Sequence, residues 1–158
     1  LFPTHADQFS PYALLSEINE ELAQEENALE MRRRWWQARP MYIENAHQLA
    51  DLLSSRDRHD EAAQILEEVM YLNPFQAETH ERLGDIYFES DQFDKAVRES
   101  EVFLSLASVD IATAHYKLAR ALLQSGNAES SRTHVLLSLE IAPSYQEAQK
   151  LLLQLVRR

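Results

Sequence analysis

The residue with the clearest catalytic potential is His80, which opens the run His80-Glu81-Arg82-Leu83-Gly84. A zinc-protease helix places a second histidine four positions after the first, so that both ligands lie on one face, and a glutamate follows the first histidine as general base. Here Gly84 occupies the position of the second ligand. The run therefore lacks a residue that this chemistry requires.

Other residues with chemical potential are isolated. His47 and Asp51 lie one helical turn apart and could hold a metal ion, but such a pair is more often an exposed helix pair. The chain has only two glycines, which excludes a Gly-rich phosphate loop, and no cysteine, which excludes disulfides, thiolate zinc sites and cysteine nucleophiles. We predict that this segment is not an enzyme and uses no cofactor or metal, although a longer parent protein could be an enzyme.

The charge balance restricts the classes of partner. Asp and Glu number 26 against 15 Lys and Arg, a formal net charge of −11, and such a chain repels phosphate backbones and anionic membranes. No apolar stretch approaches the ~18 residues of a membrane span. We therefore expect no nucleic acid and no direct membrane insertion. Cytoplasm and periplasm both stay open, and because the chain begins with Leu1 and not Met, so does the question whether it is a piece of a longer protein.

Residues 43–76 show how these side chains are positioned. An apolar stripe with helical spacing comes first, and a second follows in the same segment; the members are Ala46, Leu49, Ala50 and Leu53, then Ala62, Leu66, Val69 and Met70. The polar run 54–58 separates them, and Asn73-Pro74 ends the second stripe because proline disfavours helical geometry in the residue before it. The segment is predicted to be two helices joined by a turn.

The same pattern returns along the chain at a period of about 34 residues. Three kinds of position recur in a fixed order. The large column is Leu15, Leu49, Leu83 and Leu118, and the small columns are Ser16, Ala50, Gly84 and Ala119, then Ala28, Ala62, Ala96 and Ser131. Pro40, Pro74 and Pro143 form a proline column.

This pattern resembles the tetratricopeptide repeat, most closely in Leu83-Gly84, Tyr87 and Ala96, and the resemblance covers residues 9–145. It implies an all-α fold, a right-handed α-α superhelix. We expect one domain over residues 1–158, with four helix-turn-helix repeats at 9–42, 43–76, 77–111 and 112–145 and a capping helix at 146–158. Leu152, Leu153 and Val156 are expected to face inward on that cap.

The basic and aromatic run 31–36 invites a nucleic-acid or lipid interpretation. Trp35 and Trp36, however, align with packing positions of the later repeats. Cations near a helix C-terminus are also favoured by the helix dipole. We therefore favour a structural role for the run.

In tetratricopeptide-repeat proteins the first helices of successive pairs line a concave groove. Carried onto this sequence, the resemblance implies a groove that is acidic along three repeats and basic at the fourth. Its predicted residues are Glu17, Glu44, His47, Asp51, Glu78, Glu81, Asp85, Tyr116 and Arg120. Such a groove would repel a C-terminal carboxylate and attract lysine or arginine.

Three functions remain open. The first is a non-catalytic scaffold that binds a protein or peptide with basic residues in this groove. The second is an accessory domain of a larger bacterial enzyme, since the C-terminal part is similar to repeat regions appended to metallopeptidase domains. The third is self-association through an exposed apolar face, for which Trp36 or Phe75 could serve.

Overall fold

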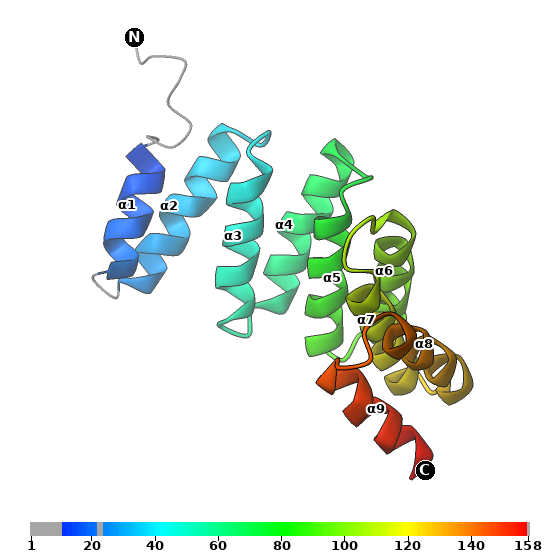
Figure 1. The fold of residues 1–158 in the computed structure, drawn as a ribbon. Helices are drawn as coiled ribbons and strands as arrows, with labels where there is room; N and C mark the ends of the chain where they lie inside the picture. Colours follow the sequence, from blue (N-terminus) through cyan, green and yellow to red (C-terminus); the bar gives the residue numbers. More distant parts are fainter. Residues whose placement is uncertain (1–10, 22–23, 158) are drawn as a thin grey trace. The chain divides into compact units, whose positions relative to one another are not determined.

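The computed structural model of the chain describes residues 11–21 and 24–157 (Figure 1). Phe9 and Ser10, with which the first predicted repeat begins, and Arg158 at the end of the predicted cap lie outside the described residues. Within the described ranges every regular element is an α-helix. The chain divides into two compact units, residues 1–72 (unit 1) and residues 73–158 (unit 2).

Unit 1 consists of two helix hairpins. Their helices are α1 (Pro11–Glu21), α2 (Glu25–Ala38), α3 (Ile43–Ser54) and α4 (His59–Leu72). The predicted apolar stripe of α3 is fully buried, and on α4 Ala62, Leu66 and Val69 are buried while Met70 is partly buried. The polar turn between them contains Asp57 at φ 58°. Helical periodicity thus predicted both helices and the faces that they bury.

Unit 2 consists of two further hairpins and a final helix. Its helices are α5 (Ala77–Glu89), α6 (Phe93–Leu106), α7 (Ile111–Gln124), α8 (Ala128–Ile141) and α9 (Gln146–Val156). The turn before α8 uses Gly126 at φ 92°, a backbone conformation that glycine adopts without steric cost. Asp110, in the connection between α6 and α7, has φ 55° and caps α7 by accepting a hydrogen bond from the Thr113 amide.

The small columns mark where the two helices of a hairpin approach each other. The Ser16 hydroxyl donates to the Ala28 carbonyl at 3.3 Å, and the Ser131 hydroxyl donates to the Ala119 carbonyl at 2.7 Å. A Cβ atom on Gly84 would lie 3.3 Å from the Ser100 hydroxyl of α6. Larger side chains at these positions would separate the helices, which explains why the columns contain only Ser, Ala and Gly.

The large column has one exception. Leu49 and Leu83 are 0% exposed and Leu118 is 2% exposed, but Leu15 is 44% exposed. No described helix precedes α1, so the side of α1 that carries Leu15 has fewer neighbours than the same side of a later helix.

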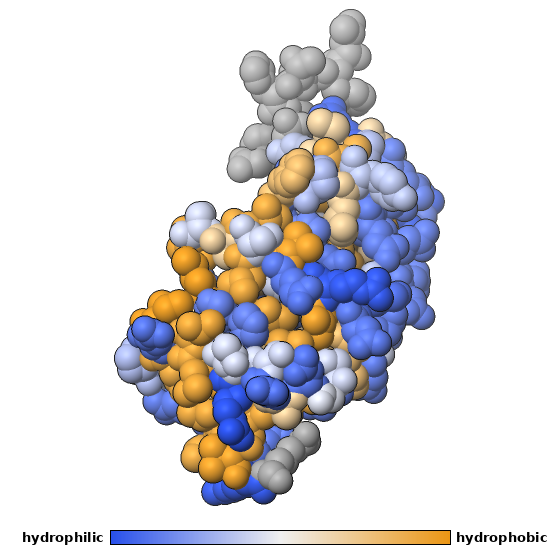
Figure 2. Space-filling view, turned by 90° about the vertical axis from the view of Figure 1, so that its right-hand side faces the viewer, coloured by the Kyte–Doolittle hydropathy of each residue, from blue (hydrophilic) through white to orange (hydrophobic). Residues whose placement is uncertain are grey.

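On α9 the predicted inward face was wrong at two of three positions. Ala148, Leu151 and Leu155 are buried, Leu152 is partly buried, and Leu153 and Val156 are 57% and 68% exposed. Leu153 stands at the repeat position of Ala119, which contacts the second helix of its hairpin. No described second helix follows α9, so the corresponding face stays open, and Figure 2 shows apolar residues gathered at the lower end, which carries α9.

None of the described helices combines the length and apolar character that crossing a bilayer would require.

Candidate functional site

The histidine that opens the protease-like run is a packing residue. His80 is 3% exposed, and its two ring nitrogens lie 2.7 Å from the Glu99 carboxylate and 2.9 Å from the Pro74 carbonyl. Both ring nitrogens lie within hydrogen-bonding distance of these oxygen atoms, so the ring links α5 to α6 and to the turn before α5. Neither nitrogen is available to bind a metal in this arrangement.

The two residues of the second metal candidate, His47 and Asp51, differ in burial. His47 is 1% exposed, whereas Asp51, one turn later, is exposed. Among residues 11–21 and 24–157, no group of three or more His, Asp or Glu side chains is arranged to hold a metal ion. Of the predicted groove residues in α3, His47 therefore packs inside, whereas Glu44 and Asp51 face solvent.

A pocket of about 640 Å³ lies between α1 and α3, the first helices of the two hairpins of unit 1. Glu17 of α1 and Glu44 of α3 line it, as do the ring of Trp35 from α2 and Tyr42 from the α2–α3 connection. The remaining lining residues are Ala13, Met41, Ile43 and Gln48. The structure thus brings two predicted groove carboxylates to one concavity, which also has an aromatic wall that the sequence did not predict.

Hydrogen bonds fix one side of this pocket. Arg32, which is 9% exposed, donates to the Gln48 Oε1 atom at 2.6 Å. The Gln48 Nε2 atom in turn donates to Glu44 Oε1 at 3.2 Å. The Trp35 and Tyr42 rings lie with centroids 5.5 Å apart at an interplanar angle of 31°. This chain of contacts fixes the Glu44 carboxylate in the pocket that the tilted aromatic pair also lines.

In unit 2 the predicted groove carboxylates are already paired with cations. Lys117 Nζ donates to Glu81 Oε1 at 2.5 Å and to Asp85 Oδ2 at 2.6 Å. Arg120 binds the other oxygen of Asp85, and its guanidinium lies 4.3 Å from the centroid of the Phe88 ring. This network links α5 to α7 and neutralises much of the negative charge on that face.

Glu78 and Tyr116, the remaining groove candidates, also have neighbours within unit 2. Glu78 accepts from Arg82 at 2.9 Å, a pair on one helix face. The Tyr116 ring packs on the Tyr145 ring with centroids 5.1 Å apart. Burial raises the pKa of Tyr145, and a hydrogen bond from Thr113 partly opposes this effect. Lys117 was missed at the sequence level, although it directly follows the predicted groove residue Tyr116.

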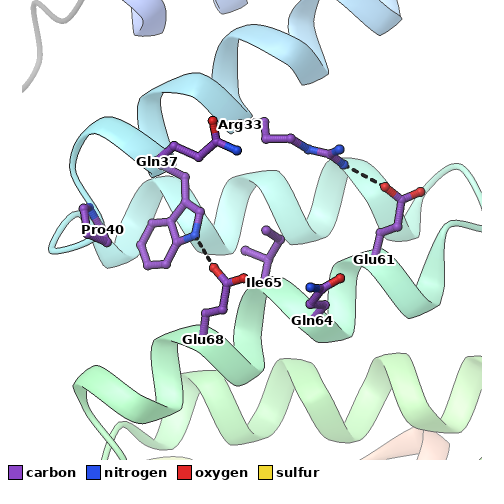
Figure 3. A pocket seen from close by; sticks show the side chains of 8 residues that line it. Arg33, Gln37, Pro40, Glu61, Gln64, Ile65 and Glu68 are labelled. Atoms are coloured by element: carbon purple, nitrogen blue, oxygen red, sulfur yellow. Dashed lines mark hydrogen bonds and ion pairs between the residues drawn. The ribbon is translucent and has the colours of Figure 1, made fainter.

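The basic and aromatic residues of the run 31–36 form contacts within unit 1. Arg33 reaches Glu61 at 2.7 Å, and the Trp36 indole N–H donates to Glu68 at 2.8 Å; both contacts are drawn in Figure 3. Hydrogen bonds from Arg58 and Arg33 lower the pKa of Glu61 to about 2. Arg34 pairs with Glu30 on its own helix.

These contacts surround a second pocket, of about 300 Å³, between α2 and α4. Trp36 is only 3% exposed, so it offers no apolar surface for self-association, whereas Phe75 is 79% exposed. The run therefore stabilises unit 1, as the structural interpretation predicted.

Comparison with known proteins identifies the architecture. Residues 43–76 match the tetratricopeptide repeat family model. MamA from Desulfovibrio magneticus RS-1 aligns over 99% of this chain and 87% of its own at a TM-score of 0.82, with 20% sequence identity. A thermophilic tetratricopeptide-repeat protein of Thermus thermophilus aligns over 98% of this chain and 85% of its own, at a TM-score of 0.71 and with 19% sequence identity.

The fold is the tetratricopeptide-repeat fold. A third similar structure, the first tetratricopeptide-repeat region of Spaghetti bound to an HSP90 peptide, covers 71% of this chain and 88% of its own, with a TM-score of 0.66 and 17% identity. Comparison with curated proteins finds no significant match in sequence. At these identities the similarity shows that the all-α tetratricopeptide-repeat fold was predicted correctly, and it shows nothing further about function.

Proposed function

We propose that the chain is a non-catalytic interaction scaffold that holds a protein or peptide against the first helices of its hairpins. The observation that carries this proposal is the pocket between α1 and α3, where Glu17 and Glu44 stand beside an aromatic wall. Concave sites with apolar walls and a few placed polar groups are the usual form of a binding site. A peptide-bound structure of the same fold is consistent with this role.

The partner carries lysine or arginine where it meets unit 1. Glu17, Glu44 and Asp51 are exposed there, and a row of carboxylates raises the encounter rate and the selectivity for cationic partners. Each exposed contact contributes only about 0.2–1 kcal/mol, so useful affinity requires several of them together with apolar contacts.

Unit 2 contributes less to this selectivity. Glu81 and Asp85 are bound by Lys117 and Arg120, and a basic partner would have to displace these cations. The acidic groove of the sequence prediction is therefore proposed for unit 1 alone. The second candidate, an accessory domain of a larger enzyme, stays a prediction that no contact in the described residues favours.

The test is the binding of two fluorescent peptides of equal length, one rich in lysine and arginine and one rich in glutamate. We expect the basic peptide to bind and its affinity to fall as salt rises, because screening weakens contacts between exposed charges. Equal binding of the two peptides, or an affinity that does not change with salt, would refute the proposal.

A further inference from the structure

We propose that the pocket between α1 and α3 is an anchor site for one arginine or lysine side chain of the partner. Glu17 and Glu44 form ion pairs with its charged end, and the Trp35 indole N–H donates a hydrogen bond to a backbone carbonyl of the same segment. The inference rests on the proposed function and makes it specific, because it names the one place where the partner's basic residue enters.

The first argument is the shape and composition of the pocket. At about 640 Å³, it falls within the range of about 300 to 1,000 Å³ that is typical of ligand sites. The two carboxylates come from different helices, and the Trp35–Tyr42 pair lines the same pocket. Long basic side chains combine an apolar stem with a charged end, so they match a pocket with an aromatic wall and carboxylates beside it.

The second argument concerns the cationic partners of the two carboxylates. No lysine or arginine in the described part of the chain forms an ion pair with Glu17 or Glu44, and Glu44 accepts a hydrogen bond from the neutral Gln48 amide. In unit 2, by contrast, Glu81 and Asp85 are bridged by Lys117. A basic partner side chain would supply to unit 1 the cation that Lys117 supplies to unit 2.

The third argument is independent of charge. Trp35 is 7% exposed and lines the pocket, yet its indole Nε1–H has no hydrogen-bond partner among the described residues. The neighbouring Trp36 is similarly buried, and its indole N–H is satisfied by Glu68. Buried donors in folded proteins are nearly always bonded, because an unsatisfied one loses its hydration without compensation. An unsatisfied buried donor on a residue that lines the pocket points to an acceptor that arrives with a ligand.

Proton and nitrogen NMR of the full chain can test the site directly. The chain has two tryptophans and thus two indole N–H signals, of which that of Trp36 is an internal control. The probe is N-acetyl-arginine N-methylamide, which carries one guanidinium and flanking carbonyls. Its citrulline analogue has the same shape without the charge. We expect the arginine probe to shift the Trp35 signal saturably while the Trp36 signal stays in place.

Matched substitutions test which carboxylates bind the arginine probe. E17Q and E44Q should each weaken the arginine probe by about two- to fivefold, the effect of removing one exposed charge contact, while E129Q on α8 should leave it unchanged. A Trp35 signal that does not move, an equal shift with citrulline, or an equal loss with E129Q would overturn the inference. If the basic peptide of the preceding section binds while Trp35 is unaffected, only the anchor site fails; if neither ligand binds, the proposed function fails as well.

Discussion

At the scale of single residues, two histidines of unit 2 share a contact that depends on their protonation. The Nδ1 atoms of His115 and His134 lie 3.0 Å apart, and the ring centroids are 5.2 Å apart. Burial lowers the pKa of both rings below the ordinary value of 6.5; the His134 charge lowers that of His115 further, while Glu101 partly opposes the shift at His134. Only a pair that is not doubly protonated can share this hydrogen bond.

The sign of the resulting pH dependence follows from the direction of these shifts. Because the folded pKa values are depressed, the unfolded chain binds more protons once the pH falls below about 6.5–7, so acid favours unfolding. We predict that the thermal midpoint of unit 2 falls between about pH 7.5 and about pH 5.5, and that the fall is smaller in H134Q and in H115Q. Circular dichroism melts would measure it. Variants with the same pH slope as the parent would contradict this interpretation.

At the scale of elements, α9 separates what a pattern can predict from what it cannot. The stripes of α3 and α4 followed from helical spacing, which is a local property of the sequence. Which face of α9 is buried depends instead on its neighbours, so Leu153 and Val156, aligned with inward positions of the earlier repeats, are exposed. Periodicity predicted the helix, and its packing against α7 and α8 determines which face is buried.

This account of α9 predicts different costs for two neighbouring leucines. L155A should lower the free energy of unfolding by about 2–5 kcal/mol, because Leu155 is 4% exposed within the core cluster of unit 2. L153A should change it by less than about 0.5 kcal/mol, because Leu153 is largely in solvent. Urea denaturation measures both values. Equal costs would mean that the face carrying Leu153 is covered.

The α5–α7 ion-pair network leads to a prediction about binding. K117Q removes the cation that bridges Glu81 and Asp85, so Glu81 becomes available to a basic ligand while Asp85 keeps its ion pair with Arg120. Affinity for the basic peptide should rise by about two- to fivefold. K150Q on the exposed side of α9 changes the net charge equally and is the control. If both variants gain the same affinity, net charge and not the local network determines binding.

At the scale of the whole molecule, the sequence predicted the fold more completely than the site. Columns of large and small residues predicted the hairpins because each hairpin repeats the same packing problem. The pairing of Lys117 with Glu81 and Asp85 depends on how far side chains of adjacent hairpins reach, and the Trp35 wall depends on how α2 packs behind α1 and α3. Neither is visible in a spacing pattern.

The account depends most on the claim that carboxylates on the first helices of unit 1 receive the partner. The decisive measurement is the affinity of the basic peptide for E17K/D51K and for E129K/E140K, two variants of equal net charge whose changes lie on first helices and on the second helix α8. We predict that E17K/D51K binds at least about tenfold more weakly than the parent, and that E129K/E140K binds with nearly parental affinity. An equal loss in both would contradict the account, because the peptide would then respond to total charge and not to this surface.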